Sequence, residues 1–196
     1  MSVLRAGYGE TIITPRLGTD LTGFGFYLDR KAERVLDDLK VRALCLDDRS
    51  TRLLIISCDL LGLTVAQADR VRGQVGAALG LPACNVLLAC THTHSGPATV
   101  ALPGLGRVDP DYMRHLPQAI LKAAELAAAS GEESEFGFGM EAVEPVGFNR
   151  RRRNFLEIDP WLKVAVFRRK DCRLFLLNYA CHAVTLGPTK EVSADC

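Results

Sequence analysis

The sequence predicts an α/β fold in which layers of mixed β-sheet carry helices packed on their faces. Segments with strand patterns alternate with at least two segments of helical periodicity along the 196 residues. One strand segment is apolar at nearly every position, which is typical of a central strand covered on both sides. No internal repeat or low-complexity linker divides the chain, so we expect residues 1–196 to form one unit.

Two neighbouring strands are expected in the first third of the chain. Residues 39–47 (LKVRALCLD) alternate apolar and other side chains over their middle, the pattern of a half-buried strand. Arg49 and Ser50 then form a turn into residues 53–58 (LLIISC), the run that is apolar on both faces. Residues 85–90 (NVLLAC) form another buried strand after an intervening helix.

The intervening helix has clear end signals. Thr64 offers an N-cap hydroxyl and Gln67 follows three residues later, which is the spacing of a capping box. Apolar positions recur at helical spacing from there to Leu79. Gly80 then ends the helix.

A second helix and three further strands follow. The helix is expected over residues 109–131, where an aspartate cap precedes a proline at the first helical position. Pro117 lies inside this range and is expected to kink or split the helix. The strands are expected at residues 136–140, 162–167 and 174–180.

Composition excludes several classes of protein. Apolar residues make up 48% of the chain, and 24 Lys and Arg against 23 Asp and Glu give a formal net charge of +1. This balance argues against a nucleic-acid partner, and no apolar run approaches the ~18 residues of a membrane helix. The N-terminus has no signal-peptide pattern, and seven cysteines without a close Cys-x-x-Cys pair fit a reducing compartment. We therefore expect a cytoplasmic protein with no transmembrane segment and no nucleic-acid partner.

Three of the four histidines lie where apolar strands are expected to end. His92 and His94 follow NVLLAC directly, and His182 ends the apolar residues 174–182. Residues i and i+2 of an extended segment share a face, so His92 and His94 can converge on one metal, or one can bind it while the other acts on a substrate. Histidines gathered from separate strand ends are typical of catalytic zinc sites. A strand-end histidine is also a common hydrogen-bonded structural residue, so the spacing leaves both interpretations open.

Other polar candidates have simpler interpretations. His115, on the second predicted helix, is expected to be a surface or hydrogen-bonded residue. Residues 149–153 (NRRRR) are expected to form a solvated charged face, and the alternative is that one arginine reaches a substrate oxygen. Cys181 and His182 are neighbours on an expected strand and face opposite ways, so they do not form a nucleophile–base pair.

Five motifs occur in an order that resembles the N-terminal part of the neutral/alkaline (non-lysosomal) ceramidase family. They are Gly7-Tyr-Gly-Glu-Thr-Ile-Ile-Thr-Pro15, Thr22-Gly-Phe-Gly25, Thr91-His-Thr-His-Ser-Gly-Pro97, Phe148-Asn-Arg150 and Ala180-Cys-His-Ala-Val184. The third motif is the most specific, and the set covers nearly the whole chain. The resemblance implies that residues 1–196 are the N-terminal portion of an incomplete catalytic domain. A C-terminal half or a partner chain would then complete it and add a glutamate and a tyrosine as zinc ligands.

The resemblance also implies a reaction and its residues. The reaction is zinc-dependent hydrolysis of the amide of an N-acylsphingosine (ceramide) or a related lipid-like N-acyl amide, which yields a fatty acid and an amine. By match to the motifs, His92 and His182 are zinc ligands. His94 is the catalytic residue, as proton shuttle or stabiliser of the tetrahedral oxyanion, and Arg150 binds the substrate near the scissile amide.

Two other functions stay open. Metal-dependent enzymes of the amidohydrolase barrel type also have a His-x-His pair after a strand, but regular strand–helix units follow it there, whereas strands cluster in pairs here. A non-catalytic binding domain is the other alternative, because the implied glutamate and tyrosine ligands are not in this sequence.

Overall fold

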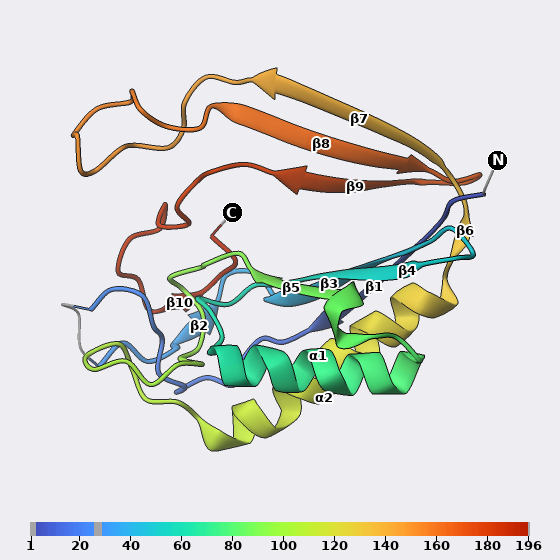
Figure 1. Ribbon diagram of the computed structural model, residues 1–196. Helices are drawn as coiled ribbons and strands as arrows, with labels where there is room; N and C mark the ends of the chain where they lie inside the picture. The colour runs from blue at the N-terminus through green and yellow to red at the C-terminus, as the bar shows by residue number, and fades with distance from the viewer. Residues whose placement is uncertain (1–2, 26–28, 196) are drawn as a thin grey trace.

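Three layers make up the structure: a pair of helices, a five-stranded sheet and a three-stranded sheet (Figure 1). The structure is a computed structural model and describes residues 3–25 and 29–195. Both helices lie on one face of the five-stranded sheet, and the three-stranded sheet lies over the other face (Figure 1). The α/β class with mixed sheet layers is therefore confirmed.

The five-stranded sheet has the order β5-β4-β3-β1-β6. Its strands are β1 (Arg5–Ile12), β3 (Lys40–Asp47), β4 (Arg52–Cys58), β5 (Val86–Cys90) and β6 (Glu132–Glu133). Only the β4–β5 pair is parallel, so the sheet is mixed. This mainly antiparallel arrangement differs from the regular parallel strand–helix units of an amidohydrolase barrel, and that alternative is wrong.

Two smaller sheets complete the strands. The three-stranded sheet is antiparallel and has the order β7-β8-β9; its strands are β7 (Glu135–Ala142), β8 (Trp161–Arg168) and β9 (Arg173–Asn178). A short parallel pair joins β2 (Arg34–Val35) to β10 (Glu191–Val192). This pair brings segments from opposite ends of the sequence together.

Helix α1 (Val65–Leu79) has the predicted ends. The Thr64 hydroxyl accepts a hydrogen bond from the Gln67 backbone, and the Gln67 side chain accepts one from the Thr64 backbone at 2.7 Å. Gly80 follows with φ of 65°, a left-handed conformation that glycine adopts at little cost. A short 3₁₀ turn, η1 (Ala83–Asn85), then leads into β5.

Helix α2 (Pro110–Ala129) begins at the predicted Asp109 cap but continues through Pro117 to its end. Of the two expected effects of Pro117, a kink or a split, the split is therefore wrong. A proline removes one backbone hydrogen bond, and tertiary packing compensates here because the residues that follow Pro117 bury one face of the helix. Ile120, Ala123 and Ala124 on that face are fully buried.

The core lies on both sides of the central strands. Leu54 and Ile56 of β4 are fully buried in the cluster that includes the helices. On the opposite face, Leu44 packs with Phe167 of β8 and with the half-buried Ile55. The predicted covering of both faces of LLIISC is confirmed, with helices as one cover and a sheet as the other.

Strand β1 lies between β3 and the edge strand β6, and the sequence patterns did not predict it. Its two glycines allow α2 to approach the strand closely. A Cβ atom at Gly7 would lie 2.0 Å from the Ala127 carbonyl oxygen, and one at Gly9 would lie 2.3 Å from the Ala123 carbonyl oxygen. Glycine is depleted in strands, so the residues that permit this packing also weaken the strand pattern.

The two helices of the described residues are not membrane spans, because neither is long and apolar enough to cross a bilayer.

Candidate metal centre

The three candidate histidines lie in loops rather than on strands. Strand β5 ends at Cys90, and His92 follows with φ of 70°, in the left-handed region. Strand β9 ends at Asn178, four residues before His182. His92 and His94 thus follow a strand as predicted, but the predictions that they form an extended segment and that His182 ends a strand are wrong. A left-handed residue turns the backbone sharply, so period-2 alternation does not apply to His92 and His94.

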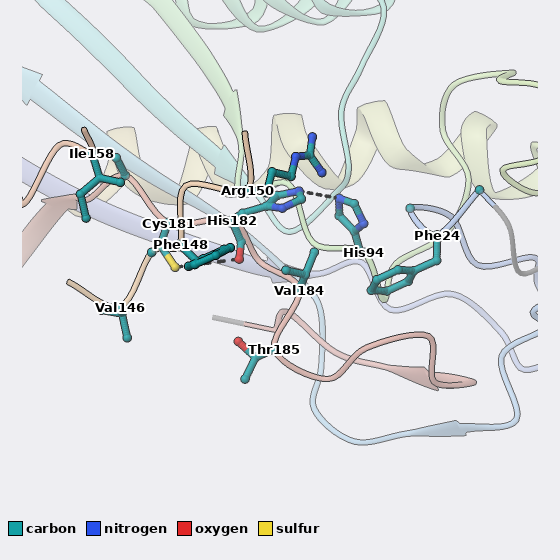
Figure 2. A pocket seen from close by; sticks show the side chains of 14 residues that line it. Phe24, His94, Val146, Phe148, Arg150, Ile158, Cys181, His182, Val184 and Thr185 are labelled. Atoms are coloured by element: carbon teal, nitrogen blue, oxygen red, sulfur yellow. Dashed lines mark hydrogen bonds between the residues drawn. The ribbon is translucent and has the colours of Figure 1, made fainter. Parts of the chain in front are cut away.

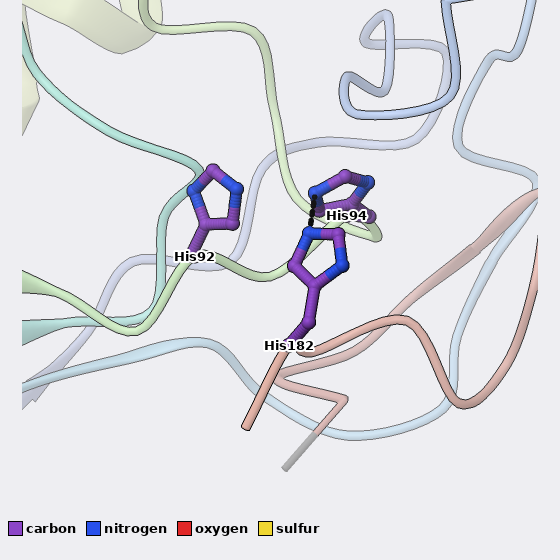
Figure 3. A group of neighbouring side chains, drawn as sticks. All are labelled: His92, His94 and His182. Carbon is purple, nitrogen blue, oxygen red and sulfur yellow. Dashed lines mark hydrogen bonds between the residues drawn. The ribbon is translucent and has the colours of Figure 1, made fainter. Parts of the chain in front are cut away.

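The three imidazoles nevertheless converge (Figure 3). One ligand atom from each of His92, His94 and His182 lies within 4.8 Å of the others. Nε2 of His94 lies 3.0 Å from Nε2 of His182, and the two rings meet edge to face. The ring of His92 stacks on that of His182, with 5.3 Å between the centroids. Residues about 90 positions apart in the sequence thus form one cluster.

This cluster fits a zinc ion. Nδ1 of His92 lies 2.7 Å from the Leu61 carbonyl oxygen. A carbonyl only accepts, so Nδ1 carries the proton and Nε2 keeps its lone pair free, as is usual for a metal-ligating histidine. Zinc–nitrogen bonds of about 2.0–2.1 Å place two tetrahedral ligands roughly 3.3 Å apart, and one ligand atom from each of the three histidines lies within 4.8 Å of the others. In the described part of the chain, Nδ1 of His94 is buried and has no hydrogen-bond partner.

The electrostatic environment favours the neutral form of His94 and His182. Burial, together with the neighbouring His182 and His92, lowers the pKa of His94 from 6.5 to about 4. Burial also lowers the pKa of His182, with smaller contributions from His92 and Arg150. Because metals bind the neutral imidazole, these two shifts favour metal binding.

The stability of the metal-free protein should fall on acidification because of His94. Its folded pKa of about 4 lies below the unfolded value of 6.5, so the unfolded state binds more protons between these pH values. The stabilisation is complete above pH 6.5 and is lost as the pH falls to about 4, by up to about 3 kcal/mol. We expect urea unfolding at the two ends of this range to show a smaller loss for His94→Gln than for the wild type. An equal loss in both proteins would contradict this assignment.

Gly23 holds the loop after β1 against the ring of His94. It has φ of 111°, and a Cβ atom built on it would lie 2.5 Å from Cγ of His94. The next residue, Phe24, meets the His94 ring edge to face, with 5.1 Å between the centroids. The Gly-Phe pair of the motif Thr22–Gly25 thus packs directly on the candidate catalytic histidine.

The substitution Gly23→Ala should displace His94 and destabilise the fold by about 1–3 kcal/mol, because it adds both a clash and backbone strain. Gly18→Ala is a matched control, since Gly18 also has a positive φ, 87°, but a Cβ atom added there would have no neighbouring atom within 4 Å. The free energies of unfolding in urea separate the clash, which only Gly23→Ala has, from the backbone strain that both variants share. Equal losses of free energy in the two variants would show that the clash with His94 does not contribute to the destabilisation.

A cavity of about 1000 Å³ opens beside two of the histidines (Figure 2). His94, His182, Arg150, Thr185 and Cys181 contribute polar side chains to its lining. Most of the remaining lining is apolar: Phe24, Val146, Phe148, Ile158, Ala180 and Val184. The cavity can therefore hold an apolar chain with a polar group near the histidines.

Arg150 and the rest of the arginine run have different surroundings. Arg150 lines the cavity and is close enough to His182 to lower its pKa. Arg152 forms an exposed ion pair with Glu157 at 3.1 Å. All four arginines of the run are exposed, and among them Arg150 alone lines this cavity.

His115 lies outside the cluster. It is exposed on α2, and its Nδ1 lies 2.7 Å from the Asp111 carbonyl oxygen one turn earlier. This agrees with the surface position expected from the sequence.

Comparison with known proteins gives a match of fold. No protein-family model and no curated protein matches the sequence. A crystal structure of neutral ceramidase from Pseudomonas aeruginosa is similar with a TM-score of 0.85, at 20% identity over 99% of this chain and 34% of that chain. A structure described as ceramidase complexed with C2 is similar with a TM-score of 0.84, at the same identity and coverage. The chain thus spans about a third of these proteins, and over nearly its whole length it has the fold of a part of neutral ceramidase.

Proposed function

We propose that residues 1–196 are the N-terminal portion of the catalytic domain of a ceramidase-like zinc hydrolase. The observation that carries the proposal is the convergence of His92, His94 and His182 within 4.8 Å on a ceramidase fold. The reaction is hydrolysis of the amide of an N-acylsphingosine or a related N-acyl amide to a fatty acid and an amine. The cytoplasmic location expected from the cysteines stays a prediction.

In this proposal each polar residue has a separate role. His92 and His182 hold the zinc ion, and the Leu61 carbonyl fixes the ring of His92. Bound zinc lowers the pKa of a water molecule to about 7 and polarises the scissile carbonyl. His94 lines the cavity as a neutral imidazole, so it can accept a proton or donate a hydrogen bond to the developing oxyanion.

A catalytic zinc site commonly has three protein ligands and a water. Two of these are proposed here, and the glutamate and tyrosine implied by the resemblance would come from a C-terminal half or a partner chain. The coverage of 34% of the ceramidase chain supports this arrangement.

The cavity supports a lipid-like substrate. Phe24, Phe148 and Ile158 form apolar walls beside the histidines, where an acyl chain loses its contact with water. Arg150 is at the same cavity, and its planar guanidinium suits hydrogen bonds to the amide carbonyl.

Hydrolysis of a long-chain N-acylsphingosine by the protein that carries this sequence tests the proposal. We expect fatty-acid release from the zinc-loaded protein, no release after chelation, and recovery when zinc is restored. A short-chain N-acetyl amide is the matched substrate and should react more slowly, because it leaves the apolar walls uncovered. Zinc-loaded protein that leaves every N-acyl amide intact would overturn the proposal.

Arg150→Ala should lower kcat/KM for an N-acyl amide by about 10–100-fold, since the variant loses a charge-assisted hydrogen bond of about 1.5–3 kcal/mol. Arg152→Ala is the matched control, because it removes the same group from an exposed ion pair in the same loop. We expect its kcat/KM to remain within about twofold of the wild type. Equal losses in the two variants would mean that the run acts only as a charged surface.

A further inference from the structure

Arg30 is a buried cation beside the candidate metal centre. Arg30 is only 5% exposed, and burial lowers the pKa of its guanidinium below the usual range. All four of its described hydrogen bonds go to backbone carbonyl oxygens. Burying a charge is costly unless hydrogen bonds satisfy it. The four hydrogen bonds reduce this cost, and they also link the guanidinium to the surrounding backbone.

The guanidinium joins three segments that surround the histidines. Nε donates to the Thr189 carbonyl at 2.8 Å, and one terminal nitrogen donates to the Thr22 carbonyl at 3.1 Å. Both terminal nitrogens donate to the carbonyl of His94, each at 3.2 Å. The partners precede β10, follow β1 and follow β5, respectively. The planar fork of a guanidinium has five donors in fixed directions, which suits the binding of three such carbonyls at once.

Phe24 connects the same guanidinium to the imidazole of His94. The Arg30 guanidinium carbon lies 4.9 Å from the centre of the Phe24 ring, a cation–π contact. The same ring also approaches the imidazole of His94 edge to face. Arg30 thus holds His94 in two ways. It donates hydrogen bonds to the backbone carbonyl of His94, and it contacts Phe24, whose ring packs against the imidazole of His94.

We propose that Arg30 is the positioning residue of His94. It holds the histidine loop where Nε2 of His94 meets Nε2 of His182, and it does so by geometry rather than by charge. A positive charge near the cluster opposes the binding of a cation, so electrostatic attraction does not explain its presence. The effect on turnover rests on the proposed function, whereas the effect on the position of His94 does not.

Histidine ring signals of the metal-free protein, observed by ¹⁵N NMR, test the proposal independently of activity. Arg30→Lys keeps the charge but loses the fork. We expect it to shift the ring signals of His94 and His182 while those of His115 stay in place. Arg16→Lys is the control, since Arg16 is 71% exposed and pairs with Asp109 on the surface; it should shift none of them. Unchanged His94 signals in Arg30→Lys would overturn the proposal.

Two further measurements complete the test. Phe24→Leu leaves the fork intact and removes the ring contact, so it should shift His94 by a smaller amount even if Arg30→Lys does not fold; an unchanged His94 would count against the proposal. In zinc-loaded protein, Arg30→Lys should lower kcat for an N-acyl amide by about 10-fold or more while zinc content equals that of the wild type, because it displaces the proposed catalytic histidine and not a proposed ligand. A kcat equal to that of the wild type would show that charge alone suffices. A wild type that binds no metal would instead refute the proposed function, and the ring signals would still decide the role of Arg30.

Discussion

His92→Ala should abolish zinc binding, which is the largest effect expected of a single substitution in this protein. His92 is one of the two proposed ligands from this chain, and the Leu61 carbonyl already fixes its tautomer and orientation. His115 cannot replace such a ligand, because it lies on α2 outside the cluster. Elemental analysis after dialysis should show zinc in the wild type and almost none in the variant.

His115→Ala is the matched control for this measurement. It removes an exposed imidazole whose described hydrogen bond is to its own helix, so zinc content should equal that of the wild type. Retention of zinc by His92→Ala would contradict the assignment of His92 as a ligand.

His94→Ala should leave zinc in place and lower the turnover of an N-acyl amide by about 10²–10⁴-fold, the usual range for loss of a general acid–base residue. His94 lines the cavity together with His182, whereas His92 does not. This position suits a group that acts on the substrate. Turnover and zinc content should be measured on the same preparation, so that loss of metal is not mistaken for loss of catalysis.

The outcome for zinc in His94→Ala decides between two assignments. Nε2 of His94 lies only 3.0 Å from Nε2 of His182, so the geometry also allows His94 to be a third ligand. Equal loss of zinc in His94→Ala and His92→Ala would establish that alternative and contradict the division of roles proposed here.

Regular patterns in the sequence predict much of this fold. The ends of α1 follow from Thr64, Gln67 and Gly80, because capping depends on short-range hydrogen bonds. The burial of β4 follows from its unbroken apolar run. Strand β1 has no such pattern. Its Gly7 and Gly9 are needed because α2, an element more than 100 residues away in the sequence, packs closely on the strand.

The candidate site is only partly predictable for a related reason. The motifs, and the expected positions of the histidines after strands, predict that His92, His94 and His182 lie close together. Their actual geometry depends on the left-handed backbone of His92 and on a loop after β9, which have no periodic pattern. Arg30 is harder still to foresee, because its carbonyl partners include residues 64 and 159 positions away.

X-ray absorption spectroscopy of the zinc-loaded chain tests the central claim most directly, because it identifies the atoms bound to the metal. The competing ligands in the described residues are free thiols, including the exposed Cys181 next to His182. We predict imidazole nitrogen scattering at about 2.0–2.1 Å in the wild type, lost in His92→Ala. Sulfur scattering at about 2.3 Å, or a chain that retains no zinc, would contradict a histidine metal centre in this protein.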